Sequence, residues 1–151
     1  MPKIELTNMV MIRDAATNRV LVQDRVKNWK GLSFPGGDIE ENESIVDSAV
    51  REVKEETGLD VRNLKPCGVI HWLNNRTHDR YLVFLFKTAD YSGELIAESE
   101  EGRNLWMTID ELRAAPSDNG MPDYLPMFLG GGYCEAFGSW NDDEPWEMVY
   151  K

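Results

Sequence analysis

The chain has 151 residues, 42% hydrophobic and 28% charged, which are ordinary values for a globular protein and exclude wholesale disorder. This length suits a single core, so we expect residues 1–151 to form one domain. The formal net charge is −11, from 16 basic and 27 acidic residues. Such a surface repels nucleic-acid backbones and anionic membranes, so we expect neither a nucleic acid polymer nor a membrane as partner.

The first third of the chain predicts two strands and a long loop. The strands are Leu6–Ile12 and Arg19–Gln23, joined by a turn at residues 15–18. The loop over residues 25–37 contains Trp29 and Phe34, and because loops avoid exposing such side chains, part of it should pack or line a cleft. The start has no apolar run of a signal peptide, and no segment approaches the ~20 apolar residues of a membrane span, so we expect a cytoplasmic protein.

The remainder of the chain mixes strands with short helices. Short helices are predicted to begin at Asp110 and to cover Tyr124–Leu129. The predicted strands are Pro66–Leu73, Tyr81–Lys87, Leu105–Ile109, Tyr133–Trp140 and Trp146–Tyr150, the last two joined as a hairpin across residues 141–144. No internal repeat or linker interrupts them, so one α+β domain is expected.

The two cysteines, Cys67 and Cys134, are far apart in the chain. We expect two buried, reduced thiols, with a disulfide or a reactive thiol as the alternative.

The most specific pattern is the segment Gly37–Leu59, GDIEENESIVDSAVREVKEETGL. Five residues separate Gly37 from Glu43, and seven more separate Glu43 from the run Arg51–Glu56, which Gly58 follows after one residue. At ordinary residue frequencies, a chance match to this spacing has odds of roughly one in a million.

A helix is predicted between Ser44 and Gly58. Ser44 followed by Asp47 resembles a capping box, and Gly58 suits a left-handed helix end. At about 100° per residue, one apolar face should be buried. Its residues are Ile45, Val46, Ala49, Val50 and Val53.

Three glutamates, Glu52, Glu55 and Glu56, occupy an arc beside this face, while Arg51 is expected to point away from it. Clustered like charges are unfavourable unless a cation intervenes, and hard oxygen ligands favour Mg²⁺, with Mn²⁺ as a possible substitute. The alternative is a solvated acidic face that pairs with lysines.

The segment is the signature of the Nudix family, and the chain resembles that family over its whole length. The resemblance implies a mixed and antiparallel sheet sandwich flanked by helices, with the signature as a loop–helix–loop. It also implies attack of water on a phosphorus of a nucleoside diphosphate linked to a further group. The implied metal ligands are Glu52, Glu55, Glu56 and the carbonyl of Gly36.

The resemblance implies further roles around these ligands. Glu101 is the first candidate for an additional catalytic carboxylate, ahead of Glu98 and Glu100, and the general base is either Glu52 or Glu101. Structural support is expected from Gly37, Glu43, Arg51 and Gly58.

The segment from Glu98 to Asp123 is similar to the Nudix branch that hydrolyses oxidised purine nucleoside triphosphates such as 8-oxo-dGTP. The resemblance implies that Asp123 meets the base edge and that Arg25 contacts phosphate. Base contacts are also assigned to Ser33, Phe34 and Met121, with other residues common in this branch at the positions of Ser33 and Met121, and a plain core role is the alternative for Phe34 and Met121.

We therefore expect a magnesium-dependent enzyme that converts a nucleoside triphosphate to the monophosphate and pyrophosphate. The alternative enzyme is a pyrophosphatase for ADP-ribose, sugar nucleotides or dinucleotides. The alternative outside enzymes is a Nudix-fold module that senses nucleotides without turnover. The expected partner is a nucleotide, and the protein is expected to be a monomer or a homodimer.

Overall fold

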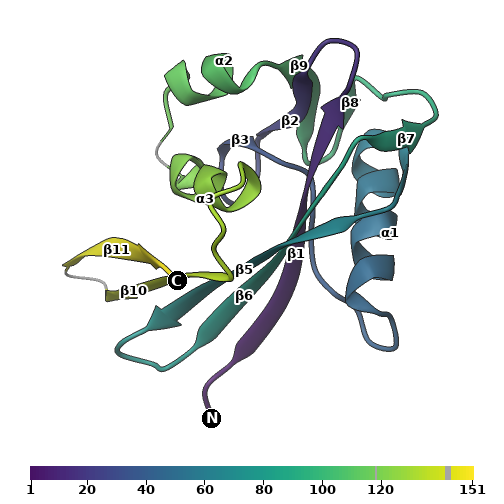
Figure 1. Ribbon diagram of the computed structural model, residues 1–151. Coiled ribbons are helices and arrows are strands. Elements are labelled where there is room, and N and C mark those ends of the chain that lie inside the picture. Colours follow the sequence, from purple (N-terminus) through teal and green to yellow (C-terminus); the bar gives the residue numbers. More distant parts are fainter. Residues whose placement is uncertain (118, 142–143) are drawn as a thin grey trace.

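The computed structural model describes residues 1–117, 119–141 and 144–151 (Figure 1). The strands are β1 (Ile4–Asp14), β2 (Arg19–Arg25), β3 (Gly31–Ser33), β4 (Asp60–Arg62), β5 (Lys65–Asn74), β6 (Arg80–Thr88), β7 (Asp90–Ser92), β8 (Glu98–Ser99), β9 (Gly102–Met107), β10 (Glu135–Asn141) and β11 (Glu144–Tyr150). The helices are α1 (Ile45–Thr57), α2 (Ile109–Ala114) and α3 (Met121–Phe128). No described helix has the length and apolar character that crossing a membrane requires.

The main sheet has the strand order β11-β10-β5-β6-β1-β2-β9-β8, with β3 paired to β2. Strand β1 runs parallel to β6 and β5 runs parallel to β10, whereas the other pairs are antiparallel. Because β1 and β2 pair only at Arg13↔Val20 and Asp14↔Arg19, the sheet opens beyond that corner into two parts. Mixed pairing and separate helices confirm the predicted α+β class.

Helices cover both faces of this sheet (Figure 1). On one face Ala49 and Val53 of α1 join Val10 and Ile12 of β1 in a buried cluster. On the other face α2 and α3 contribute a second cluster that includes Leu112, Met121, Leu125 and Phe128. The sheet therefore separates two cores, and the signature helix belongs to only one of them.

Helix α1 begins and ends as predicted. The Ser44 hydroxyl accepts a hydrogen bond from the backbone N–H of Asp47 at 3.0 Å, and Gly58 closes the helix with φ 81°. A side chain at Gly58 would also meet the carbonyl of Glu94. One member of the predicted apolar face is wrong: Val46 is 46% exposed, because the helix turns this position toward solvent and buries Glu56 instead.

Several element boundaries differ from the prediction. The loop over residues 25–37 contains the short strand β3, and the pair β4–β7 was not predicted, since three-residue strands carry little periodicity. Strand β9 begins at Gly102, and Ile109 starts α2 instead of ending a strand. Helix α3 begins at Met121, three residues early, because Pro122 is tolerated in a first helical turn.

The predicted C-terminal hairpin is confirmed as β10 paired with β11, while residues 142–143 of its predicted turn lie outside the described residues. Trp72 of β5 packs edge-on against Trp146, with ring centroids 5.1 Å apart. The expectation of two buried thiols is wrong for Cys134, which is exposed near the start of β10, whereas Cys67 is buried.

Candidate active site

A glycine-containing loop brings the signature against β1. The carbonyls of Pro35 and Gly37 accept hydrogen bonds from the backbone of Val10 and Asn8 at 2.8 and 2.9 Å. Because a peptide group is trans, the Gly36 N–H faces away from the Pro35 carbonyl, and it donates to Glu56 Oε2 at 3.1 Å. The loop is thus held by β1 on one side and by α1 on the other.

The two loop glycines lie in close contact with neighbouring groups, backbone at Gly36 and a flexible side chain at Gly37. A side chain at Gly36 would place its first carbon 2.1 Å from the carbonyl oxygen of Asn8. A side chain at Gly37 would place that carbon 2.5 Å from the carboxyl carbon of Glu52. The Asn8 side chain links the loop to α1, because it accepts a hydrogen bond from Gly37 N at 3.3 Å and donates one to the Ser48 hydroxyl at 2.9 Å.

Arg51 is the centre of a hydrogen-bond network. Its guanidinium forms two bonds to Glu43, at 2.7 and 3.0 Å, and a third to the Asp38 carbonyl at 3.0 Å. It also donates to Glu52 at 3.0 Å and to Glu55 at 3.2 Å. The expectation that Arg51 points away from the carboxylates is therefore wrong, because its long side chain reaches back over the helix surface.

The network has a clear electrostatic effect. The hydrogen bond from Arg51, with help from the backbone N–H of Glu40, lowers the pKa of Glu43 to about 2, and the Glu43 carboxylate raises the pKa of Arg51. Two parallel charge-assisted bonds fix both the loop and the guanidinium. These are the contacts that a structural role for Glu43 and Arg51 requires.

Glu56 is the least solvated carboxyl group of the signature, with 6% of the residue exposed. Burial raises its pKa to about 8, and the nearby Glu52 and Glu101 act in the same direction, while the Gly36 N–H and Arg25 oppose them. A carboxyl group with this pKa is mostly protonated at neutral pH unless a cation approaches it.

Glu52 and Glu55 differ in exposure. The Glu52 side chain is 15% exposed and burial raises its pKa, whereas the Glu55 side chain is 59% exposed. Within the described parts of the chain, no three acidic, histidine or cysteine side chains are close enough to share one ion. In this arrangement Glu55 bonds Arg51 at 3.2 Å and lies at the surface, so its role as a third metal ligand stays a prediction.

The chemistry of the donors nevertheless fits a hard divalent cation. Glu52 and Glu56 are oxygen ligands in a partly desolvated position, and their carboxylates lack the counter-charge that would compensate burial fully. The pKa of both groups is raised mainly by this burial, so a bound cation would stabilise their charged forms.

Arg25 and Glu101 lie beside Glu56. The Arg25 guanidinium is 3.5 Å from Glu101 Oε2, with side chains 17% and 33% exposed. Arg25 also donates to the Asn28 carbonyl at 3.0 Å, and it acts electrostatically on both Glu56 and Tyr81. The structure therefore brings together Arg25, Glu101, Glu52 and Glu56, as a phosphate-binding and carboxylate site would need.

Three expected base contacts are core residues. Ser33, Phe34 and Met121 are each only 1% exposed. The Ser33 hydroxyl donates to the Phe34 carbonyl at 2.9 Å, and Phe34 packs edge-on against Phe128. Their assignment to substrate contact is corrected accordingly, since a buried side chain has no face open to a ligand.

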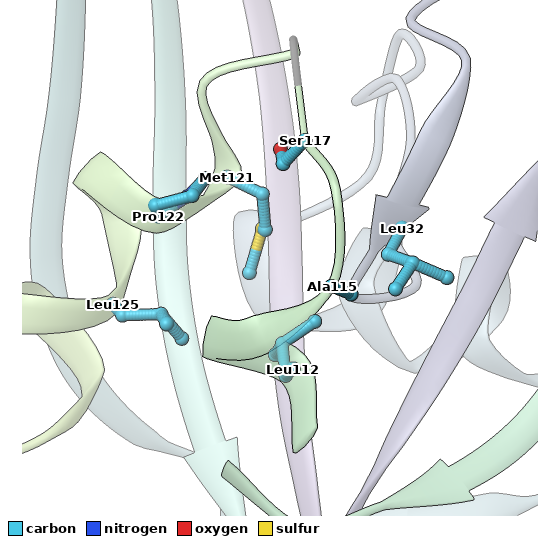
Figure 2. A pocket seen from close by; sticks show the side chains of 7 residues that line it. All are labelled: Leu32, Leu112, Ala115, Ser117, Met121, Pro122 and Leu125. Carbon is cyan, nitrogen blue, oxygen red and sulfur yellow. The ribbon is translucent and has the colours of Figure 1, made fainter. Parts of the chain in front are cut away.

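A small hollow beside Met121 does not open this side chain to a ligand. Figure 2 shows Leu32, Leu112 and Leu125 around Met121, where β3, α2 and α3 meet. The space between them has no room for a water molecule. It is a packing gap between apolar side chains, too small for a nucleobase.

An aromatic cluster joins the loop after β2 to β5, β6 and α3. Trp29 lies 5.4 Å from Tyr124 between ring centroids, and Trp72 Nε1 donates to the Tyr124 hydroxyl at 2.8 Å. Burial raises the pKa of Tyr81, which also lies close enough to Tyr124 to affect the pKa of that residue. Trp29 holds a left-handed backbone conformation, φ 57°, an unusual state for a bulky residue.

The sequence pattern did not single out this cluster, because its members come from four separate elements. Only the aromatic content of the loop over residues 25–37 indicated that part of it would pack. Asp123 precedes Tyr124 on α3, and burial raises the pKa of its carboxyl group. Asp123 is thus placed beside the aromatic cluster, at its α3 edge.

Comparison with known proteins gives the family. Residues 5–128 match the NUDIX domain family, which is most of the chain. The chain belongs to the Nudix family. Nudix hydrolases generally use divalent metals such as Mg²⁺ and act on small nucleotide substrates, and membership of the family supports a hydrolase activity for this Nudix protein.

Two curated relatives illustrate the range of the family. The chain is 30% identical over 126 residues to the uncharacterized Nudix hydrolase YvcI of Bacillus subtilis, covering 80% of this chain and 77% of that protein. It is 36% identical over 104 residues to the oxidized purine nucleoside triphosphate hydrolase of Mus musculus, covering 67% of this chain and 62% of that protein.

A solved structure confirms the fold. The MutT protein of Bacillus halodurans superimposes with a TM-score of 0.80 over 97% of each chain, at 22% sequence identity. At this identity the likeness shows the Nudix fold and nothing about substrate.

Proposed function

We propose that this Nudix hydrolase converts a nucleoside triphosphate to the monophosphate and pyrophosphate, with oxidised purine nucleotides such as 8-oxo-dGTP as its preferred substrates. Glu52, Glu55 and Glu56, with the Gly36 carbonyl, would hold Mg²⁺ or Mn²⁺. When bound, such a cation polarises phosphate oxygens and lowers the pKa of a coordinated water. Arg51 positions Glu52 through its hydrogen bond, and either Glu52 or Glu101 would accept the proton of the attacking water.

The proposal rests on three kinds of group that lie next to one another: carboxylates, the Arg25 guanidinium and aromatic rings. Arg25 lies close enough to Glu56 and to Tyr81 to affect the pKa of both, and Tyr81 in turn affects Tyr124. Carboxylates, a guanidinium and aromatic rings therefore succeed one another across the site. A nucleoside phosphate presents the matching order of metal-bound phosphate, anionic phosphate and flat base.

The purine preference is supported by two weaker observations. The mouse relative named above is an oxidized purine nucleoside triphosphate hydrolase. In this chain Asp123 stands beside the aromatic cluster, and burial raises the pKa of its carboxyl group. A carboxyl group at that place can exchange hydrogen bonds with the edge of a base, and it can distinguish oxidised from normal purines by their donors.

The test is a panel of nucleotides with Mg²⁺ in which every product is identified. Pyrophosphate and monophosphate from 8-oxo-dGTP, released faster than from dGTP, are the expected result. Cleavage of ADP-ribose, sugar nucleotides or dinucleotides in preference to triphosphates would replace this substrate class. Nucleotide binding without any product at any magnesium concentration would show a binding module instead of an enzyme.

Two variants separate the roles of the residues. Glu55→Gln should lower turnover by orders of magnitude without unfolding, whereas Glu41→Gln, at an exposed position in the loop before α1, is the matched control and should not. Asp123→Ala should change the ratio of rates for oxidised and normal purines more than the rate with a poor substrate. An unchanged ratio would remove Asp123 from base recognition.

A further inference from the structure

The two cysteines of the chain meet at one pocket on the α3 side of the sheet. The pocket has a volume of about 420 Å³, and Cys67, Gly68, Lys87 and Cys134 are among its lining residues. It shares no lining residue with the carboxylate site around Glu56. No step of the proposed reaction uses either thiol.

Strand register sets the separation of the two cysteines. Strands β5 and β10 are parallel with Glu135 opposite Val69, and the Val69 N–H donates to the Cys134 carbonyl at 3.1 Å. Cys134 therefore lies opposite Gly68, one residue beyond Cys67. At ideal spacings of about 4.8 Å between strands and about 3.3 Å per residue, this register corresponds to a Cα separation of about 6 Å, within the range that a disulfide spans.

Gly68 allows this approach. It has φ 94° in an irregular stretch of β5 between Pro66 and Val69, and a side chain there would place its first carbon 2.5 Å from the Cys134 carbonyl oxygen. The position is therefore restricted to glycine by both conformation and space. The backbone of Cys134 rests directly against β5, beside Cys67.

We propose that Cys67 and Cys134 are a reversible disulfide pair, formed when a hydroperoxide reaches the exposed Cys134. In the reduced protein the Cys67 sulfur lies 3.7 Å from the Lys65 carbonyl oxygen. Both cysteines line the same pocket, so a change of the Cys67 rotamer is the movement that would bring its sulfur to Cys134.

The two thiols have different parts in the reaction because their exposure differs. Cys134 is exposed, so its thiolate attacks the peroxide, an S–O bond forms, the O–O bond breaks, and a sulfenic acid results. Cys67 then attacks the Cys134 sulfur. An S–S bond forms, the S–O bond breaks, and the departing hydroxide takes the thiol proton as water. Both sulfurs are oxidised, and one hydrogen peroxide is reduced to two waters.

Formation of the bond would fix the start of β10 to β5. Through β5 it would also restrain Trp72, whose indole bonds Tyr124 of α3. Because the disulfide closes a loop of more than sixty residues in the unfolded chain, oxidation should raise the melting temperature, by about 5–10 °C.

The experiment is titration of the reduced full-length protein with hydrogen peroxide, followed by peptide mapping without reductant. A peptide pair joined through Cys67 and Cys134, lighter by two hydrogens and restored by dithiothreitol, is expected. Its rate of formation should not depend on protein concentration, and the same treatment in urea should slow it. In Cys67→Ala, Cys134 should instead accumulate as a sulfenic acid that dimedone traps.

Three results would overturn the proposal. The first is sulfinic acid at Cys134 while Cys67 stays a thiol in the wild-type protein. The second is a disulfide that joins Cys134 of two copies. The third is Cys134→Ser protein in which Cys67 is oxidised as fast as in the wild type. Nucleotide hydrolysis is not the readout, so failure here leaves the proposed function intact.

Discussion

Replacement of Glu56 by glutamine should make the metal-free protein more stable at alkaline pH. Glutamine keeps the shape of the side chain and can still accept the hydrogen bond from Gly36 N, but it carries no charge to desolvate. The comparison of Glu56→Gln with the wild type therefore isolates the cost of ionising one buried carboxyl group.

The sign of the effect follows from the raised pKa of Glu56. In the unfolded chain the group loses its proton near pH 4.5, and in the folded protein near pH 8, so the folded state binds more protons between these values. The contribution of Glu56 to the free energy of unfolding is fully present below pH 4.5 and is lost as pH rises through 8. The full difference corresponds to at most about 5 kcal/mol.

Urea denaturation in EDTA at pH 5, 7 and 9 measures the effect. Wild type and Glu56→Gln should unfold at similar urea concentrations at pH 5, and the variant should be more stable by several kcal/mol at pH 9, of order 3–5. Addition of Mg²⁺ at pH 9 should stabilise the wild type and leave Glu56→Gln nearly unchanged. The exposed substitution Glu41→Gln controls for the loss of one negative charge. A difference between wild type and Glu56→Gln that stays constant from pH 5 to pH 9 would refute the reasoning.

Three further substitutions test neighbouring contacts. Gly37→Ala forces the flexible Glu52 carboxylate aside, so kcat should fall at least tenfold. The free energy of unfolding should change by less than about 1 kcal/mol. A normal kcat would show that Glu52 can move without loss of activity. Arg51→Lys keeps the charge but loses the paired bonds to Glu43, so urea unfolding should show a loss of about 1–3 kcal/mol, and equal stability would deny the network its role. Trp29→Ala should raise KM for nucleotides about tenfold or more with little effect on kcat, as removal of a stacking partner does, and Trp29→Phe should restore most of the affinity.

The signature helix could be predicted from the sequence because its determinants are local. Ser44 and Gly58 mark its ends through contacts within a few residues, and the structure places both caps as expected. The long side chain of Arg51 could not be placed in this way. A helical wheel gives the direction of a Cβ atom, whereas Arg51 contacts Glu52 and Glu55 through a guanidinium that bends back along the helix.

The aromatic cluster could not be predicted from the sequence, because its contacts are not local. Trp29, Trp72, Tyr81 and Tyr124 come from a loop, two strands and a helix, and only the tertiary fold brings them together. The burial of Phe34 and Met121 depends on the same fold. The spacing of residues in the chain carries no information about which of several apolar side chains will face a ligand and which will face the core.

The parallel pairing of β1 with β6 has a consequence for how the protein reaches its native state. Ile4 pairs with Arg80, and Lys3 N donates to Asp79 at a separation of 76 residues. The Gly36 loop and α1 dock on β1, yet β1 gains this neighbour only after β6 has been synthesised. Long-range parallel pairing is slow, so a nascent chain that ends before Thr88 should leave this edge of β1 unpaired and depend on chaperones until β6 emerges from the ribosome.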